Sequence, residues 1–169
     1  SGKLQAYAAG AYKTAGMSAN QYMEQATSFS ASLLQSLGGD TEAAVEYANM
    51  AITDMSDNAN KMGTNMGRIT DAYQGFAKQN FTMLDNLKLG YGGTQEEMQR
   101  LLDDAEKISG IKYDISSYAD IVDAIHVVQK EMGITGTTAQ EAAATIEGSV
   151  AMAKAAYSNW LTGLADENA

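Results

Sequence analysis

The sequence predicts an all-α protein, a compact array of about six to seven amphipathic helices from which the terminal helices are free to extend. Apolar residues recur at helical spacing in almost every segment of the chain. Proline is absent from all 169 residues, where average usage would place roughly eight, and helices exclude interior proline. Glycine with Ser, Thr or Asp separates the apolar segments, as expected where one helix ends and another begins.

The first half of the chain divides into three helices. A segment over residues 3–15 ends at Gly16, and Ser18 is placed to cap a second helix. After a double-glycine stop, Thr41 restarts the chain into a long helix whose apolar stripe alternates small alanine with flexible methionine. Such a narrow seam lets another helix approach closely. We therefore predict partner contacts along this stripe and near the end of the last helix, at Ala44, Ala48, Ala51, Met55 and Trp160.

The second half continues in the same way. Apolar stripes over residues 66–76, 98–108, 121–132 and 146–161 each predict a helix, and a short helix is expected within 81–89. The last helix is expected to run from Thr138 towards Leu164. Thr94 with Glu97, and Thr138 with Glu141, have the spacing of capping boxes. Residues 111–115 form the single stretch that suits an extended conformation.

Composition limits the classes of partner and chemistry. The chain carries 11 Lys and Arg against 21 Asp and Glu, a formal charge of −10. It has no basic cluster, so we expect no direct nucleic-acid binding by this fragment. Cysteine is absent, which removes disulfides, thiolate zinc sites and cysteine nucleophiles. No apolar run is long enough for a transmembrane helix in this piece of sequence.

Two features resemble catalytic or binding motifs, and each has a plainer structural interpretation. His126 is the single histidine. It lies beside Ile125 on the flank of an apolar stripe, so we expect it between core and surface, hydrogen-bonded to solvent or backbone, rather than as a catalytic base. The loop from Gly90 to Thr94 precedes a helix, as phosphate-binding loops do. The loop lacks the Gly-Lys-Ser/Thr ending of a Walker phosphate-binding loop, and two glutamates follow it. We therefore interpret it as the place where one helix ends and the next begins.

The third helix carries acidic and amide side chains that are oxygen donors of the kind calcium binds. They keep helical phase and lack the spacing of a calcium loop. A solvated helix face is therefore expected for Asp54, Asp57, Asn58 and Asn60. We predict no catalytic residue, no cofactor and no metal, and hence that the chain is not an enzyme.

The ends of the sequence indicate a piece of a longer protein. Ser1-Gly2 without a methionine looks like the scar of a cleaved tag, and the chain stops after a charged segment. We assign residues 1–16 to this scar and the end of a preceding helix. Residues 17–169 are assigned to a single helical domain of a longer chain, because no linker interrupts them.

Long stretches of the sequence carry a family resemblance. They cover residues 29–64, 73–110, 124–150 and 155–169, and include GGDTEAAVEYANMAITDMSDNANKMGT and NLKLGYGGTQEEMQRLLDDAEKISG. From Met17 onward the chain resembles the tail tape measure proteins of siphophages and related prophages of Gram-positive bacteria. Nearly the whole chain takes part, and the family offers no catalytic motif to carry over onto these residues.

The resemblance implies a structural role in a phage tail. The family's long helical chain occupies the lumen of the tail tube, scaffolds its assembly, sets its length and is released during DNA delivery. The implied partners are tail tube and tail assembly proteins, tail assembly chaperones and other copies of the chain. The implied location is the lumen of the virion tail, and the host cytoplasm during assembly. Membrane contact is expected only through other parts of the parent chain.

Two other classes of function stay open from the residues alone. A cell-wall hydrolase module needs only two carboxylates at a set separation, and the chain has 21 acidic residues to choose from. A membrane-active segment is the second, because residues 1–39 are poor in charge and rich in alanine and tyrosine. That region lacks the basic face that strengthens binding at a bilayer surface.

Overall fold

Helices make up the regular structure of the described chain, with no strand among them. The computed structural model describes the backbone of residues 2–167 and the side chains of all of these except 142, 144–152, 156 and 164–167. The elements are α1 (Gly2–Ala15), α2 (Ala19–Ser36), α3 (Thr41–Met62), α4 (Met66–Ala77), the 3-10 helix η1 (Leu84–Leu87), α5 (Gln95–Ser109), α6 (Tyr118–Glu131) and α7 (Thr137–Glu167). The predicted all-α class is confirmed.

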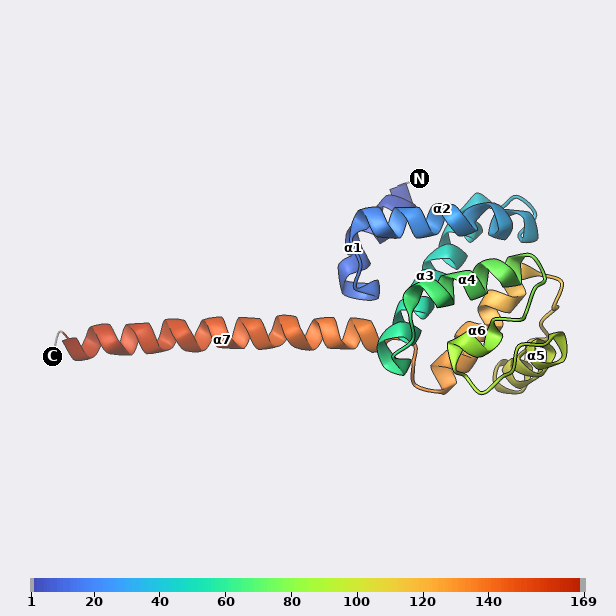
Figure 1. Cartoon of the computed structure of the whole chain (residues 1–169). Coiled ribbons are helices and arrows are strands. Elements are labelled where there is room, and N and C mark those ends of the chain that lie inside the picture. The colour runs from blue at the N-terminus through green and yellow to red at the C-terminus, as the bar shows by residue number, and fades with distance from the viewer. Residues whose placement is uncertain (1, 168–169) are drawn as a thin grey trace.

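Helix α3 lies at the centre of the molecule (Figure 1). It contacts α1, α2, α4, α6 and α7. Its second half is therefore surrounded on nearly all sides, and the buried residues there include polar as well as apolar side chains. We call residues 2–136, which contain α1 to α6 and η1, the body.

Short polar side chains fix where the helices of the body begin. Ser18 accepts a hydrogen bond from the amide of Gln21, whose own side chain returns a bond to the Ser18 amide, so this capping box is complete. The predicted cap at Ser18 is confirmed. The long helix predicted to restart at Thr41 is capped one residue earlier, because the Asp40 carboxylate accepts the amide of Ala43 at 3.0 Å.

An aromatic cluster joins α2, α4 and the segment that follows α4. The rings of Phe29 and Tyr73 lie 6.4 Å apart, those of Tyr73 and Phe76 5.7 Å, and those of Phe76 and Phe81 6.2 Å. All four side chains are buried. Aromatic pairs at these spacings add to the free energy gained from burying their area.

Three further sequence predictions concern segments outside the long central helices. Helix α1 packs against the rest of the body, because Ala8, Ala11 and Ala15 are buried and α1 contacts α2, α3 and α7. Residues 111–115, predicted to suit an extended conformation, connect α5 to α6 and form neither helix nor strand. The short helix predicted within 81–89 is present as the 3-10 helix η1.

Helix α7 leaves the body and projects away from it as a single rod (Figure 1). It has 31 residues, which gives a length of about 46 Å at 1.5 Å per residue. Of its predicted apolar stripe, Ala153, Tyr157 and Leu161 are exposed. The side chains of Ile146 and Val150 lie outside the described residues. An extended terminal helix is thus present at the C-terminal side of the described chain.

Candidate functional site

The body holds a cluster of polar side chains at the place where α7 begins. We call it the α7 junction, and it consists of Asp54, Asp57, Asn58, His126, Gln129 and Thr135. Asp54, Asp57 and Asn58 are 0–1% exposed. The prediction of a solvated helix face is therefore wrong for these three residues, although Asn60 does lie at the surface.

Asp57 holds the first turn of α7. One carboxylate oxygen accepts the Gly136 amide at 2.7 Å and the other accepts the Thr138 amide at 3.0 Å. A negative charge at a helix N-terminus is favoured by the free amides and by the helix dipole. The predicted capping box of Thr138 with Glu141 is wrong, because a residue of α3 supplies the cap, and Glu141 instead accepts a bond from Asn60 at 2.9 Å.

Asp54 connects α3 to α6 and to the loop before α7. Its carboxylate accepts bonds from His126 Nδ1 at 3.0 and 3.1 Å and from Thr135 Oγ1 at 3.0 Å. Burial raises the pKa of Asp54, and the bonds from His126 and Thr135 act against this rise. The bond to Asp54 raises the pKa of His126, and its partial burial acts the other way. His126 is partly buried in the middle of α6, between core and surface as expected, but its partner is a buried carboxylate and not solvent or backbone.

Asn58 completes the junction. Its amide nitrogen donates to the carbonyl of Leu87 and to Oε1 of Gln129, both at 2.9 Å, and its oxygen accepts from Thr64 Oγ1 at 2.7 Å. Gln129 in turn donates to the backbone carbonyl of Asp54 at 3.0 Å. The buried amides are thus bonded to one another and to the backbone, which fixes the positions of α3, η1 and α6 relative to one another.

The chemistry available at the α7 junction is limited. A carboxylate and an imidazole in contact form two parts of a hydrolytic triad. However, the neighbouring hydroxyl of Thr135 donates to Asp54, and no described hydroxyl bonds to His126. Among the described side chains, no three His, Cys, Asp or Glu residues are grouped so that they could hold a metal ion. The geometry fits a structural joint, and the absence of enzymatic activity stays a prediction.

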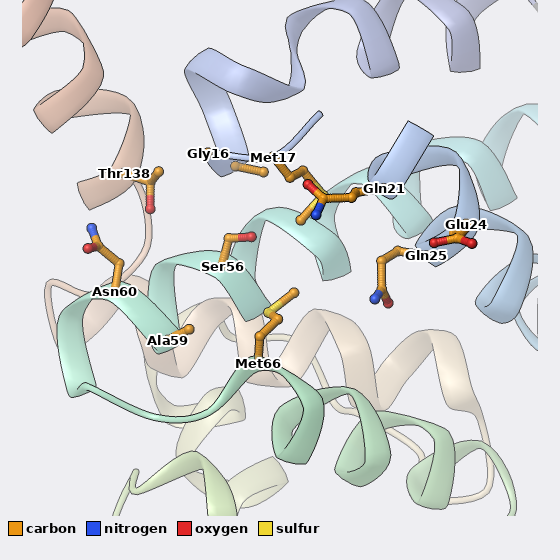
Figure 2. A pocket seen from close by; sticks show the side chains of 11 residues that line it. Gly16, Met17, Gln21, Glu24, Gln25, Ser56, Ala59, Asn60, Met66 and Thr138 are labelled. Carbon is orange, nitrogen blue, oxygen red and sulfur yellow. The ribbon is translucent and has the colours of Figure 1, made fainter. Parts of the chain in front are cut away.

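A cavity of about 610 Å³ opens beside the junction, between the α1–α2 turn, α2, α3, α4 and the start of α7. Figure 2 shows Gln21, Gln25, Ser56 and Asn60 around it together with Met17 and Met66. Thr138 also lines it. Two of its polar atoms, Oε1 of Gln25 and Oγ1 of Thr138, are buried without a hydrogen-bond partner. Glu24 is the one charged residue among those that line it, so the cavity suits neutral polar groups better than anions.

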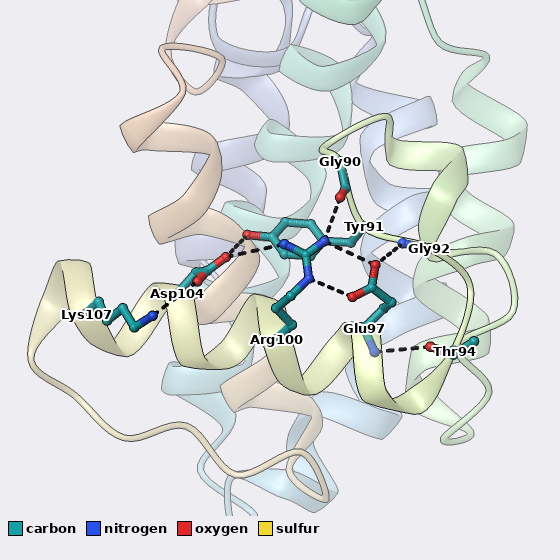
Figure 3. A network of polar contacts seen from close by, with 8 residues as sticks. All are labelled: Gly90, Tyr91, Gly92, Thr94, Glu97, Arg100, Asp104 and Lys107. Carbon is teal, nitrogen blue, oxygen red and sulfur yellow. Dashed lines mark hydrogen bonds and ion pairs between the residues drawn. The ribbon is translucent and has the colours of Figure 1, made fainter.

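The glycine-rich loop before α5 is held by the helix that follows it (Figure 3). The Glu97 carboxylate accepts the Gly92 amide at 3.0 Å, and Arg100 bonds both Glu97, at 2.6 and 3.1 Å, and the Gly90 carbonyl, at 2.7 Å. These bonds lower the pKa of Glu97 to about 2. Arg100 also lies 4.3 Å from the centre of the Tyr91 ring.

This loop acts as a helix stop and start. Thr94 accepts the Glu97 amide at 3.1 Å, as half of the predicted capping box requires. The other half is replaced, because the Glu97 carboxylate bonds the amide of Gly92 and not that of Thr94. The Glu97 carboxylate therefore already binds the Gly92 amide that a phosphate would need. The interpretation of this loop as the segment that precedes and caps the next helix is confirmed.

The predicted partner contacts separate into two groups. Ala44, Ala48, Ala51 and Met55 are 0–4% exposed, inside the body. Side chains at that depth cannot touch another protein, so their assignment as partner contacts is corrected to contacts within the chain. Trp160 is different, because it lies on the projecting part of α7 and is 59% exposed. Of the predicted contact residues, it is the one available to a partner.

Comparison with protein families, with curated proteins and with solved structures finds no match for this chain. No helix in the described part combines the length and hydrophobicity needed to cross a bilayer.

Proposed function

We propose that the chain is a structural part of a phage tail, within a tape measure protein that scaffolds the tail tube, sets its length and is released during DNA delivery. The observation that supports this best is the shape: a helical body that continues into one projecting helix of 31 residues. The sequence resemblance to tape measure proteins points the same way. A rod of this kind suits a chain that runs along a tube and meets its partners through helix faces.

The proposed partners are tail tube and tail assembly proteins, tail assembly chaperones and other copies of the chain. The available surface for them is the outer part of α7, where Tyr157, Trp160 and Leu161 are exposed. Aromatic side chains of this kind frequently supply most of the binding free energy at a protein interface. In this proposal the protein lies in the lumen of the virion tail and, during assembly, in the host cytoplasm.

Mass spectrometry of purified virions tests the tail assignment directly. Particles induced from the host that encodes this chain should contain its peptides, and these peptides should remain with isolated tails after heads are removed. Co-expression of the chain with the tail tube protein and the assembly chaperone of the same virus should yield a complex. Absence of the chain from both virions and assembly intermediates would overturn the proposal.

Two features weigh against the other classes of function. The neighbouring carboxylates of Asp54 and Asp57 are buried and already bonded, which disfavours their use as an acid and base on a sugar. Ala8, Ala11 and Ala15 of the charge-poor first segment are buried in the body, which disfavours a bilayer-bound α1. Release of muropeptides from peptidoglycan, or binding of the chain to liposomes, would instead support a hydrolase or a membrane-active protein.

A further inference from the structure

The outer part of α7, around residues 157–161, carries large apolar side chains that are exposed. Tyr157 is 62% exposed and Leu161 44% exposed, and the Tyr157 ring lies 6.0 Å from the ring of Trp160. The body contacts α7 near its beginning, where Asp57 bonds the Thr138 amide and Asn60 bonds Glu141. Because isolated helices are marginal in water, a helix that projects this far needs a surface to pack against.

The sequence of α7 has a heptad pattern that continues well beyond the part of the helix in contact with the body. Apolar residues alternate at spacings of four and three through the whole helix, at Ala139, Ala143, Ile146, Val150, Ala153, Tyr157, Trp160 and Leu164. Three and a half heptads with an apolar residue at every a and d position indicate a coiled-coil seam. Thr138 and Glu141, which contact the body, are not part of this seam, and Ala143 on the seam is exposed.

Residue sizes along the seam distinguish two orientations of a paired copy. In a parallel, in-register pair each residue meets its own equivalent, so alanine faces alanine in three layers and tryptophan faces tryptophan in another. The alanine layers then leave cavities and the tryptophan layer is overpacked, and both lower the stability of a packed core.

In an antiparallel pair large residues meet small ones instead. With the helices centred between residues 151 and 152, Trp160 lies opposite the partner's Ala143, and Leu164 opposite the partner's Ala139. Tyr157 then lies opposite the partner's Ile146, and Val150 opposite the partner's Ala153. The summed side-chain volume is far more even from layer to layer, as efficient packing requires.

Charge supports the same orientation. Glu147 and Lys154 occupy the e positions that flank the seam. Antiparallel helices bring e positions together, so position 147 of each copy lies beside position 154 of the other, and a negative residue is matched with a positive one on both sides of the two-fold axis. In a parallel pair e positions face g positions. The g positions of α7 hold only Ala142, Ser149, Ala156 and Gly163, which offer no charge to either residue.

We propose that α7 is a self-association helix, which pairs with α7 of a second copy in antiparallel orientation. The contact is two-fold symmetric and closes on itself, so it gives a dimer with the two bodies at opposite ends of a shared helical rod. The pairing deepens the self-association part of the proposed function, but it follows from α7 alone.

Sedimentation equilibrium of the purified chain tests whether the pair forms. The wild type should be a dimer in the micromolar range, and Trp160→Ala should weaken the dimer at least tenfold. Asn159→Ala is the matched control, because this exposed neighbour lies off the seam, and it should leave the dissociation constant unchanged. A wild-type chain that stays monomeric at high micromolar concentration would overturn the proposal without affecting the tail assignment, which the virion experiment tests separately.

Spin labels test the orientation, because the chain has no native cysteine. Ala155→Cys and Thr162→Cys place single labels at exposed positions on the outer side of α7. In the antiparallel pair the labels are offset along the rod by about 10 Å at 155 and about 31 Å at 162. The measured distance should therefore be clearly longer at 162. Equal distances at the two positions would show parallel pairing and contradict the proposal.

A charge swap provides an independent check of the antiparallel contact. Glu147→Lys and Lys154→Glu should each weaken the dimer by about threefold to tenfold at low salt, because like charges then face one another. The double variant should restore wild-type affinity, and high salt should remove the differences. Single variants that leave the affinity unchanged at low salt would contradict the contact between residues 147 and 154 of opposite copies.

Discussion

Helices α3 and α7 both carry an apolar stripe of alanine and larger apolar residues, yet the structure uses the two stripes in opposite ways. The seam of α3 at Ala44, Ala48 and Ala51 is covered by the helices of its own body. The outer part of α7 projects beyond the body and exposes Trp160. Periodicity therefore predicts which face of a helix will be covered, but not whether the cover comes from the same chain.

The largest expected difference between the two helices is in stability. Met55→Ala should lower the free energy of unfolding by about 2–5 kcal/mol, because it leaves a cavity in a fully buried site of α3. Leu161→Ala on α7 should change the same quantity by less than about 0.5 kcal/mol in dilute solution, where its side chain is exposed. Urea denaturation followed by circular dichroism measures both. Equal losses would mean that the outer part of α7 is packed like α3.

The connection between the two helices is expected to depend on Asp57. Asp57→Ala removes the acceptor for two amides of the first turn of α7, and loss of a helix cap costs about 1–2 kcal/mol. Hydrogen exchange should rise at the beginning of α7 and much less in α5. Asp71→Ala, at an exposed position of α4, is the control and should change neither. Unchanged protection in Asp57→Ala would show that α7 is held in place by other contacts.

The pair of Asp54 and His126 should make the joint sensitive to pH. Its contact with Asp54 raises the pKa of His126 above the ordinary value of 6.5, so the folded state binds a proton more tightly than the unfolded state. The stabilisation is complete below the unfolded pKa and is lost as pH rises through the higher folded pKa. The raised pKa of Asp54 acts in the same direction at lower pH.

Urea denaturation between about pH 6 and about pH 9 measures this effect, at about 1.4 kcal/mol for each unit of pKa difference. In wild type the free energy of unfolding should fall across this range. His126→Gln keeps a donor for Asp54 but does not titrate, so its profile should be flatter. Asp123 raises the pKa of His126 and Lys130 lowers it. Both residues are present in wild type and in His126→Gln. Parallel profiles for the two proteins would contradict the role of His126.

The smallest expected effects come from two buried tyrosines of the body. The Tyr22 hydroxyl donates to Asn49 Oδ1 at 2.6 Å, so Tyr22→Phe should cost about 0.5–1.5 kcal/mol. The Tyr73 hydroxyl is buried with no hydrogen-bond partner, so Tyr73→Phe should be neutral or slightly stabilising. Thermal unfolding distinguishes the two variants. A large loss in Tyr73→Phe would reveal a partner for this hydroxyl.

Local sequence signals predicted the helices of the body well. Ser18 with Gln21 forms the expected cap, and the stripe of α6 at Ile121, Ile125 and Val128 is buried. These features depend on residues three or four positions apart, so one segment of sequence is enough to predict them. The prediction for Thr138 failed because its helix is capped by Asp57, which is 81 residues away in the sequence.

The α7 junction was missed, although the sequence contains a signal for it. Residues 47–60 include no Lys, Arg or Glu, the long charged residues that usually cover a solvated helix face. Their polar members are short residues such as Asp54 and Asn58, which are poor helix formers. Such residues in the middle of a long helix indicate buried hydrogen bonds to other elements, but the sequence does not say which element supplies the partner.

Hydrogen exchange at increasing protein concentration tests most directly whether α7 differs from the body because it needs a second copy. The amides of α3 should show the same protection at every concentration, since the body alone covers that helix. The amides of residues 146–163 should exchange rapidly in dilute samples and become protected as the chain dimerises. Protection of α7 that is equally high at all concentrations would contradict this account.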